Sequence, residues 1–238
     1  MRITGFATVA LCGFLFITGL PLSASTIDWT YWTIATPSGS APGTAQGSIS
    51  GLGITVSYTG EVLYGNRYYP SWMPTTSYVG GTVGNQPPPS GAAINVKGAQ
   101  GFTDTITFSS PVLNPVLAIW SLGNTLIPST EARFVFNASE PFTIEASGPS
   151  AEYGPFSLSP GVGALYACLD NPNAVCGKEG NGTVQLNGTF TSITWTNPVL
   201  ESIYGFTVGV NVPEPSTLLL LAGGLLAVGM RSRHKRGR

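Results

Sequence analysis

Residues 183–210 read TVQLNGTFTSITWTNPVLESIYGFTVGV, and the pattern of this stretch indicates the fold class. Between Tyr204 and Val210 every second residue is large and apolar, with small residues between them. Such alternation is typical of a β-strand that has one face in a protein core. Two more strand-like runs, 183–186 and 190–195, flank Asn187-Gly188, and this dipeptide predicts a hairpin between them.

Similar short runs fill the chain upstream of this stretch. Further strands, bounded by Gly, Pro and Asn, are expected at 27–33, 53–58, 92–97, 102–108, 116–122, 133–136 and 142–146. The run at 116–122 (VLAIWSL) is almost continuously apolar, which predicts a central strand. Helical periodicity is nearly absent. The sequence therefore predicts an all-β protein, a single antiparallel β-sandwich of jelly-roll-like type over residues 26–211.

The charge of the chain is low and unevenly distributed. Only 9% of the 238 residues are charged, and the formal net charge is −1. Residues 26–212 hold ten acidic and four basic side chains, a net charge of −6, whereas the basic residues cluster at the C-terminus. An acidic, lysine-poor body is a poor electrostatic match for nucleic acid, so DNA and RNA are not expected as partners.

The N-terminus has the features of an export signal. Arg2 precedes an apolar run from Phe6 to Leu20, and small residues follow at 23–25. This order predicts a secretory signal peptide over residues 1–25, and hence passage through a Sec-type export machinery. The alternative is an N-terminal anchor that is not cleaved.

The C-terminal segment, residues 212–238, has three parts. Pro213, Glu214 and Pro215 form an extended, stiff tripeptide, because proline fixes φ and disfavours helix before it. The next part is a predicted apolar helix from Thr217 through Leu218, Leu221 and Leu225 to Met230. The last part is a cationic stop formed by Arg231, Arg233, Lys235, Arg236 and Arg238. This arrangement leaves the C-terminus in the cytoplasm and the body outside.

The 14-residue helix would be about 21 Å long. That is short for a bilayer core of roughly 30 Å, so we expect a transient hold in the inner membrane.

These three parts, in this order, resemble a PEP-CTERM sorting signal. The resemblance implies export by a Gram-negative bacterium that makes extracellular polysaccharide. It also implies processing by an exosortase, a membrane-embedded cysteine peptidase or transpeptidase that recognises Pro213, Glu214 and Pro215. The Thr/Gly-rich body, chiefly residues 190–210, is similar to strand-rich domains that often accompany this signal.

Two cysteines remain once the predicted signal peptide, with Cys12, is removed. In an oxidising compartment we expect Cys168 and Cys176 to form a disulfide. A metal site is the alternative, but zinc would need more Cys or His ligands. Asp170, Asn171 and Asn173 lie between the two cysteines, and their oxygens are compatible with calcium as well as with an ordinary turn.

The body has little of the chemistry that enzymes use. The only histidine, His234, lies in the basic tail, so catalytic triads and histidine-based metal sites are excluded from the body. A carboxylate pair for glycan hydrolysis is the remaining enzymatic alternative, and no motif marks one. We therefore expect a non-enzymatic, cofactor-free protein of the cell envelope or extracellular matrix.

The second hypothesis is a lectin-like module that binds extracellular polysaccharide. Its stacking platform would be formed by Tyr64, Tyr68, Tyr69 and Trp72, unless these aromatic side chains only cover the core.

Overall fold

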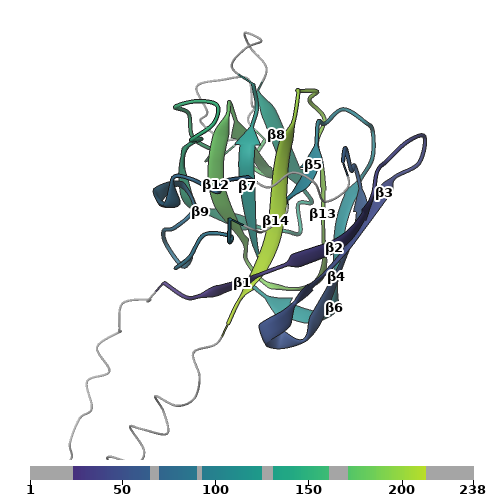
Figure 1. Ribbon diagram of the computed structural model, residues 1–238, viewed down its shortest axis with the longest axis vertical. Helices are drawn as coiled ribbons and strands as arrows, with labels where there is room; N and C mark the ends of the chain where they lie inside the picture. The colour runs from purple at the N-terminus through teal and green to yellow at the C-terminus, as the bar shows by residue number, and fades with distance from the viewer. Residues whose placement is uncertain (1–23, 65–69, 90–92, 125–130, 161–170, 213–238) are drawn as a thin grey trace, which may run out of the picture.

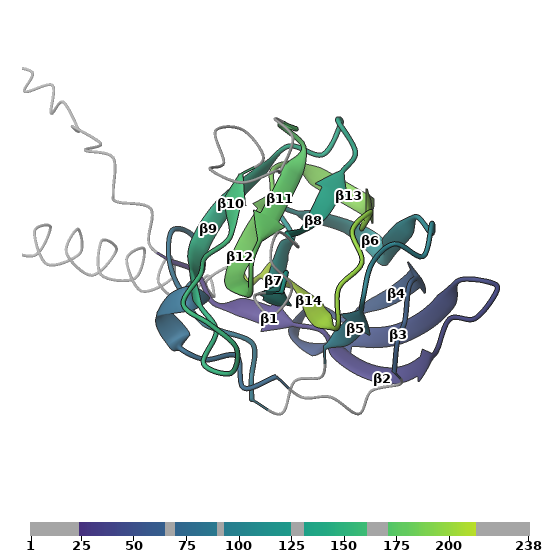
Figure 2. The same ribbon diagram turned by 90° about the horizontal axis from the view of Figure 1, so that it is seen from above.

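The computed structural model describes residues 24–64, 70–89, 93–124, 131–160 and 171–212. Two antiparallel sheets face each other, so the predicted all-β sandwich is confirmed (Figures 1 and 2). Sheet 1 has the order β1 (Ile27–Trp29), β14 (Tyr204–Asn211), β7 (Val116–Leu122), β12 (Gly180–Leu186) and β9 (Phe142–Pro149), with β5 (Ile94–Val96) paired to β14 as well. Sheet 2 has the order β10 (Ser159–Pro160), β11 (Ala174–Gly177), β8 (Ala132–Phe136), β13 (Thr189–Thr196), β6 (Asp104–Leu113), β4 (Ile54–Gly60), β3 (Gly43–Ile49) and β2 (Tyr31–Thr36). Short 3₁₀ helices occur at η1 (Ser50–Leu52) and η2 (Thr75–Ser77).

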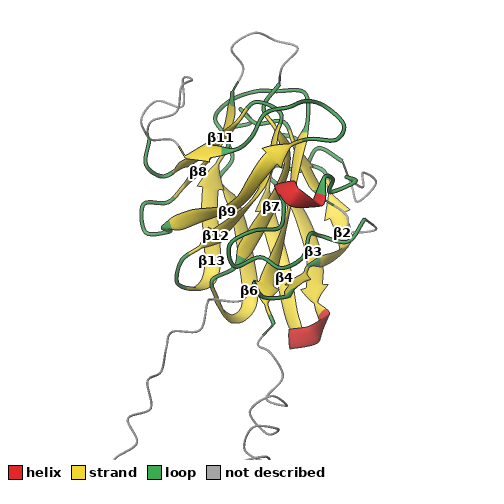
Figure 3. Cartoon of the chain, turned by 90° about the vertical axis from the view of Figure 1, so that its left-hand side faces the viewer, coloured by secondary structure: helices red, strands yellow, loops and turns green. Residues whose placement is uncertain are grey.

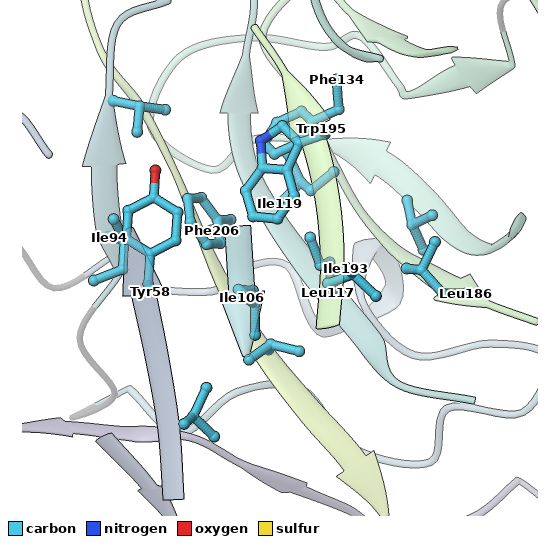
Figure 4. Packing of buried hydrophobic residues seen from close by; sticks show 14 of the residues in the cluster. Tyr58, Ile94, Ile106, Leu117, Ile119, Phe134, Leu186, Ile193, Trp195 and Phe206 are labelled. Carbon is cyan, nitrogen blue, oxygen red and sulfur yellow. The ribbon is translucent and has the colours of Figure 1, made fainter. Parts of the chain in front are cut away.

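The main core lies between the two sheets and is rich in aromatic rings. Phe206 on β14 is fully buried, and its ring centroid is 5.1 Å from that of Trp195 and 5.3 Å from that of Tyr58. Figure 4 shows these three rings among aliphatic side chains from both sheets. Edge-to-face pairs of this kind add to the free energy that burial of the rings already contributes.

A second apolar cluster covers the outer face of sheet 1. Strand β7 supplies Val116, Ala118 and Trp120 to this cluster, while Leu117 and Ile119 point into the main core. The segment 70–89 crosses this outer face and contributes the buried Trp72 and Tyr78, whose rings meet edge to face at 5.5 Å. Its helical turn η2 contacts β9 and β12 and is drawn in red in front of sheet 1 in Figure 3. Strand β7 is therefore buried on both faces, which explains its continuous apolar run.

Two sequence-based expectations about the strands were wrong, and strand β3 was missed. Strands β12 and β13 belong to different sheets, so Asn187-Gly188 connects the sheets instead of closing a hairpin. The expected strand at 27–33 divides at Thr30, because β1 pairs with β14 and β2 pairs with β3. Strand β3 was not expected, since Gly and Ala occupy most of its buried positions. Gly47 is required there, because a Cβ would lie 2.6 Å from the Thr30 methyl carbon.

Candidate functional site

The two ends of the described chain lie side by side at one end of the sandwich. Strands β1 and β14 pair with Ile27 opposite Asn211, and the Val212 amide donates to the Thr26 carbonyl oxygen at 3.0 Å. In Figure 1 both chain ends leave the lower end of the molecule, which we call the proximal end. The predicted signal peptide and the predicted sorting signal therefore both join the fold at the proximal end.

A partly apolar pocket of about 490 Å³ lies at the proximal end. Ser25 and Asn211, one from each chain end, contribute to its lining together with Leu52 and Leu113. Leu113 is 65% exposed at its rim. The pocket thus adjoins both the predicted signal-peptide junction and the start of the C-terminal segment.

The predicted sorting residues lie beyond the part of the chain that the structure describes. This holds for the Pro213–Pro215 motif, the apolar segment 217–230 and the basic residues of 231–238. Among the described residues, no helix is both long enough and apolar enough to cross a membrane. The last described strand, β14, ends at Asn211, two residues before Pro213.

The expected aromatic platform is not formed as predicted. Trp72 is fully buried against Tyr78 under the 70–89 segment, so it has no face on which a sugar could stack, and its assignment to the platform was wrong. Tyr64 is 53% exposed. Tyr68 and Tyr69 lie outside the described residues. The alternative reading of these aromatics, that they cover apolar surface, holds for Trp72.

The predicted disulfide and calcium loop are only partly within the described residues. Cys176 lies on β11 and is buried, whereas Cys168 falls outside the described ranges, so their pairing stays a prediction. Asp170 is outside as well. The Asn173 amide donates to Asn171 Oδ1 at 2.9 Å, which is the local turn that these residues commonly form.

The opposite end of the sandwich, which we call the distal end, contains buried carboxyl groups. Asp104, the first residue of β6, is 1% exposed, and its Oδ1 accepts a hydrogen bond from the Glu61 amide at 2.8 Å. The Tyr58 hydroxyl lies 2.6 Å from the same oxygen. Desolvation raises the pKa of Asp104 to about 6; the nearby Glu61 adds to this rise, and the two hydrogen bonds oppose it.

Glu61 is held by the loop that follows β5. Its two carboxylate oxygens accept hydrogen bonds from the Lys97 amide at 3.0 Å and the Gly98 amide at 2.8 Å. These bonds lower the pKa of Glu61, but desolvation is the larger effect and the net shift is upward. Glu61 and Asp104 therefore tie β4, β6 and the loop after β5 together, which is a structural role.

Glu201 and Glu179 form a different arrangement at the same end. They line a pocket of about 240 Å³ together with Ser121, Asn124 and Tyr153. The Ser121 hydroxyl donates to Glu179 Oε2 at 2.5 Å. Glu201 is 5% exposed, and neither of its side-chain oxygens has a hydrogen-bond partner among the described residues.

Burial is the largest cause that raises the pKa of Glu201, to about 10. The negative charge of Glu179 adds to the rise, and the nearby amides of Gly123 and Ile203 oppose it. Ser121 and Glu179 also adopt positive φ values, 53° and 62°, which are uncommon for residues other than glycine. No local sequence pattern marks this pocket, since Glu201 lies in a loop and Glu179 in a turn between strands. Only the fold brings them together.

The comparisons with known proteins address the C-terminal segment. Residues 211–234 match the family model described as the PEP-CTERM protein-sorting motif. Neither the curated proteins nor the solved structures include a significant match to this chain. The described part of the molecule is thus an antiparallel β-sandwich, and the matched sorting motif begins at Asn211, the last residue of β14. The chain carries a PEP-CTERM sorting motif, which implies an exported protein handled by an exosortase-related sorting system.

Proposed function

We propose that this chain is an exported, non-enzymatic protein of the cell envelope or extracellular matrix, sorted and processed through its C-terminal signal. The match of residues 211–234 to the sorting motif carries the proposal. The proposed division of the chain is a signal peptide at 1–25, a sandwich at 26–211 and a sorting signal at 212–238. A structural or adhesive role follows from the absence of histidine in residues 1–233 and the internal use of Glu61 and Asp104.

The position of β14 supports processing of the tail. This strand ends at Asn211, and the Val212 amide makes the final described hydrogen bond of the chain, to Thr26. A cut after Val212 would therefore remove no strand and no described sheet hydrogen bond. The mature sandwich would keep the pairing between β1 and β14 that joins its two ends.

The polysaccharide-binding alternative has weaker support. Trp72, one of the four residues of the predicted platform, is buried in the apolar cluster on the outer face of sheet 1. Among the described residues, Tyr64 is the only exposed member of the platform. Sugar rings bind well to aromatic faces that are open to solvent. A glycan array with the exported protein, and with Tyr64→Ala as its variant, tests this alternative directly. We expect no glycan signal that depends on Tyr64.

The sorting proposal predicts a processing defect when the motif is changed. The double variant Pro213→Ala and Glu214→Ala removes the first proline and the carboxylate of the predicted recognition motif. We expect a full-length precursor to accumulate in the membrane fraction at least tenfold over the unaltered chain. The measurement is immunoblotting and intact mass of the protein from fractionated cells of its own bacterium.

The matched control is Pro37→Ala, which removes an exposed proline between β2 and β3. This variant should mature like the unaltered chain. If the double variant instead shows the same mass and the same location as the control, the motif is not what the sorting system recognises.

A further inference from the structure

A hollow of about 430 Å³ lies on the outer face of sheet 2, over strands β2, β3 and β4. These strands lie side by side at one edge of the sandwich (Figure 2). Val56 on β4 belongs to the main core, so its neighbours Thr55 and Ser57 point outward into the hollow. The described residues that line the hollow are Thr33, Gln46, Gly47, Ser48, Thr55, Val56 and Ser57. None of these is charged, although residues 26–212 carry a net charge of −6.

The polar side chains of the hollow are almost all available to a ligand. Within the described part of the chain, Thr33 is the one lining residue whose side chain makes a hydrogen bond, donating to the Gln46 carbonyl oxygen at 3.2 Å. The Gln46 amide and the hydroxyls of Ser48 and Ser57 therefore keep their donors and acceptors. The hollow offers neutral hydrogen-bonding groups of both kinds.

An irregularity in β2 shapes the edge of the hollow. The register of β2 against β3 shifts between Trp32 and Ile34, so Thr33 has no partner residue in β3. Bulges of this kind are common at sheet edges and beside active sites, where they redirect a side chain. Here the extra residue, Thr33, lines the hollow.

Two exposed apolar side chains of β2 flank the hollow. Tyr31 pairs with Ser48, and Ile34 pairs with Gln46, so each lies on the outer face beside a lining residue. Tyr31 is 66% exposed and Ile34 is 60% exposed. An exposed aromatic ring beside hydroxyl and amide groups offers an apolar face and hydrogen bonds to the same ligand.

We propose that this hollow binds a neutral glycan, with the Tyr31 ring as its stacking face. Sugar rings combine apolar C–H faces with hydroxyl groups, which matches an apolar wall beside neutral polar groups. A charged ligand would lose hydration there without meeting an opposite charge. The site is different from the predicted platform that contained Tyr64 and Trp72. The inference rests on the adhesive role proposed above, for which it names the class of ligand.

The uncharged surface continues across sheet 2 beyond the hollow. Ser57 on β4 pairs with Thr107 on β6, and Thr107 pairs with Ser192 on β13. A second hollow of about 260 Å³, lined in part by Thr194 and Thr196, lies farther along the sheet at β13 and β8. Five strand spacings separate β2 from β8, which is about 24 Å. A polysaccharide that crosses the strands would contact both hollows, so we expect longer oligosaccharides of one series to bind more tightly.

A glycan array with the full chain, carrying neutral and acidic oligosaccharides, tests this inference. We expect binding to neutral glycans, and isothermal titration calorimetry with the strongest of them gives its affinity. Tyr31→Ala should weaken that affinity by about tenfold, because the stacking face is lost. Ser57→Arg should weaken it comparably by filling the hollow. The matched control is Tyr64→Ala, which removes an exposed tyrosine outside the hollow and should bind like the unaltered chain.

Both test substitutions are at exposed positions, and an unchanged Tm checks that the variants are folded. The inference fails if no neutral glycan binds, if acidic glycans bind equally well, or if folded Tyr31→Ala and Ser57→Arg bind as the unaltered chain does. Light scattering of the free protein tests the other occupant. A dimer that Tyr31→Ala converts to a monomer would show that this edge binds a second copy instead. These measurements use purified protein, so a negative result leaves the sorting proposal standing.

Discussion

Replacing Phe206 by alanine is expected to lower the free energy of unfolding by about 3–5 kcal/mol, the usual range for a buried aromatic residue. Phe206 is fully buried on β14, and it touches Trp195 and Tyr58 from sheet 2. Its removal would leave a cavity where both sheets meet. Urea unfolding followed by tryptophan fluorescence measures this loss, since Trp195 reports on the same place.

The matched control is Leu113→Ala, because Leu113 is 65% exposed and lies away from the aromatic group. This change should alter the free energy of unfolding by less than about 0.5 kcal/mol. Equal effects of the two substitutions would contradict the claim that the two sheets are held together mainly through the aromatic core.

The variant Asp104→Asn is expected to remove a pH dependence of stability. Burial raises the pKa of Asp104 from 3.8 to about 6 in the folded protein. Folding therefore favours the protonated acid. The resulting contribution to the free energy of unfolding is fully present below about pH 3.8 and is lost as the pH rises through 6. The loss amounts to about 3 kcal/mol, because each pKa unit corresponds to about 1.4 kcal/mol.

Asparagine keeps an oxygen for the Tyr58 hydroxyl and the Glu61 amide but cannot ionise. Urea unfolding of both proteins at about pH 3.5 and pH 7 gives the comparison. Between these two pH values, the free energy of unfolding of the unaltered chain should fall by about 3 kcal/mol relative to that of Asp104→Asn. A difference between the two proteins that stays constant with pH would mean that Asp104 titrates normally in the fold.

The fold class could be predicted because alternation and continuous apolar runs report directly on burial. Strand β7 was predicted with its correct bounds, since its two faces contact two apolar clusters and nearly every residue had to be apolar. Strand β3 escaped prediction because its buried positions are small, where neighbouring backbone approaches closely. Pairing was not predictable from local pattern either. Asn187-Gly188 suits a hairpin, but the strands that it connects pair with other partners.

The functional features likewise divide into those that a local sequence motif predicts and those that depend on the fold. The sorting signal is a local, linear motif, so the sequence alone was sufficient to propose it, and the family match at 211–234 confirms the motif. The pocket of Glu179 and Glu201 depends on the end of β7 and on four connecting segments that meet only after folding. Trp72 was assigned to a platform because exposure cannot be read from an aromatic, proline-rich segment. Its burial depends on the outer face of sheet 1.

The most direct test of the sorting account is C-terminal mass spectrometry of the protein isolated from its own cells. The account predicts a mature chain that retains β14 through Asn211 and lacks the basic tail that ends in Arg238. It also predicts that the new C-terminus lies near the Pro213–Pro215 motif. A mature exported protein that still ends in Arg238 would contradict processing through this signal.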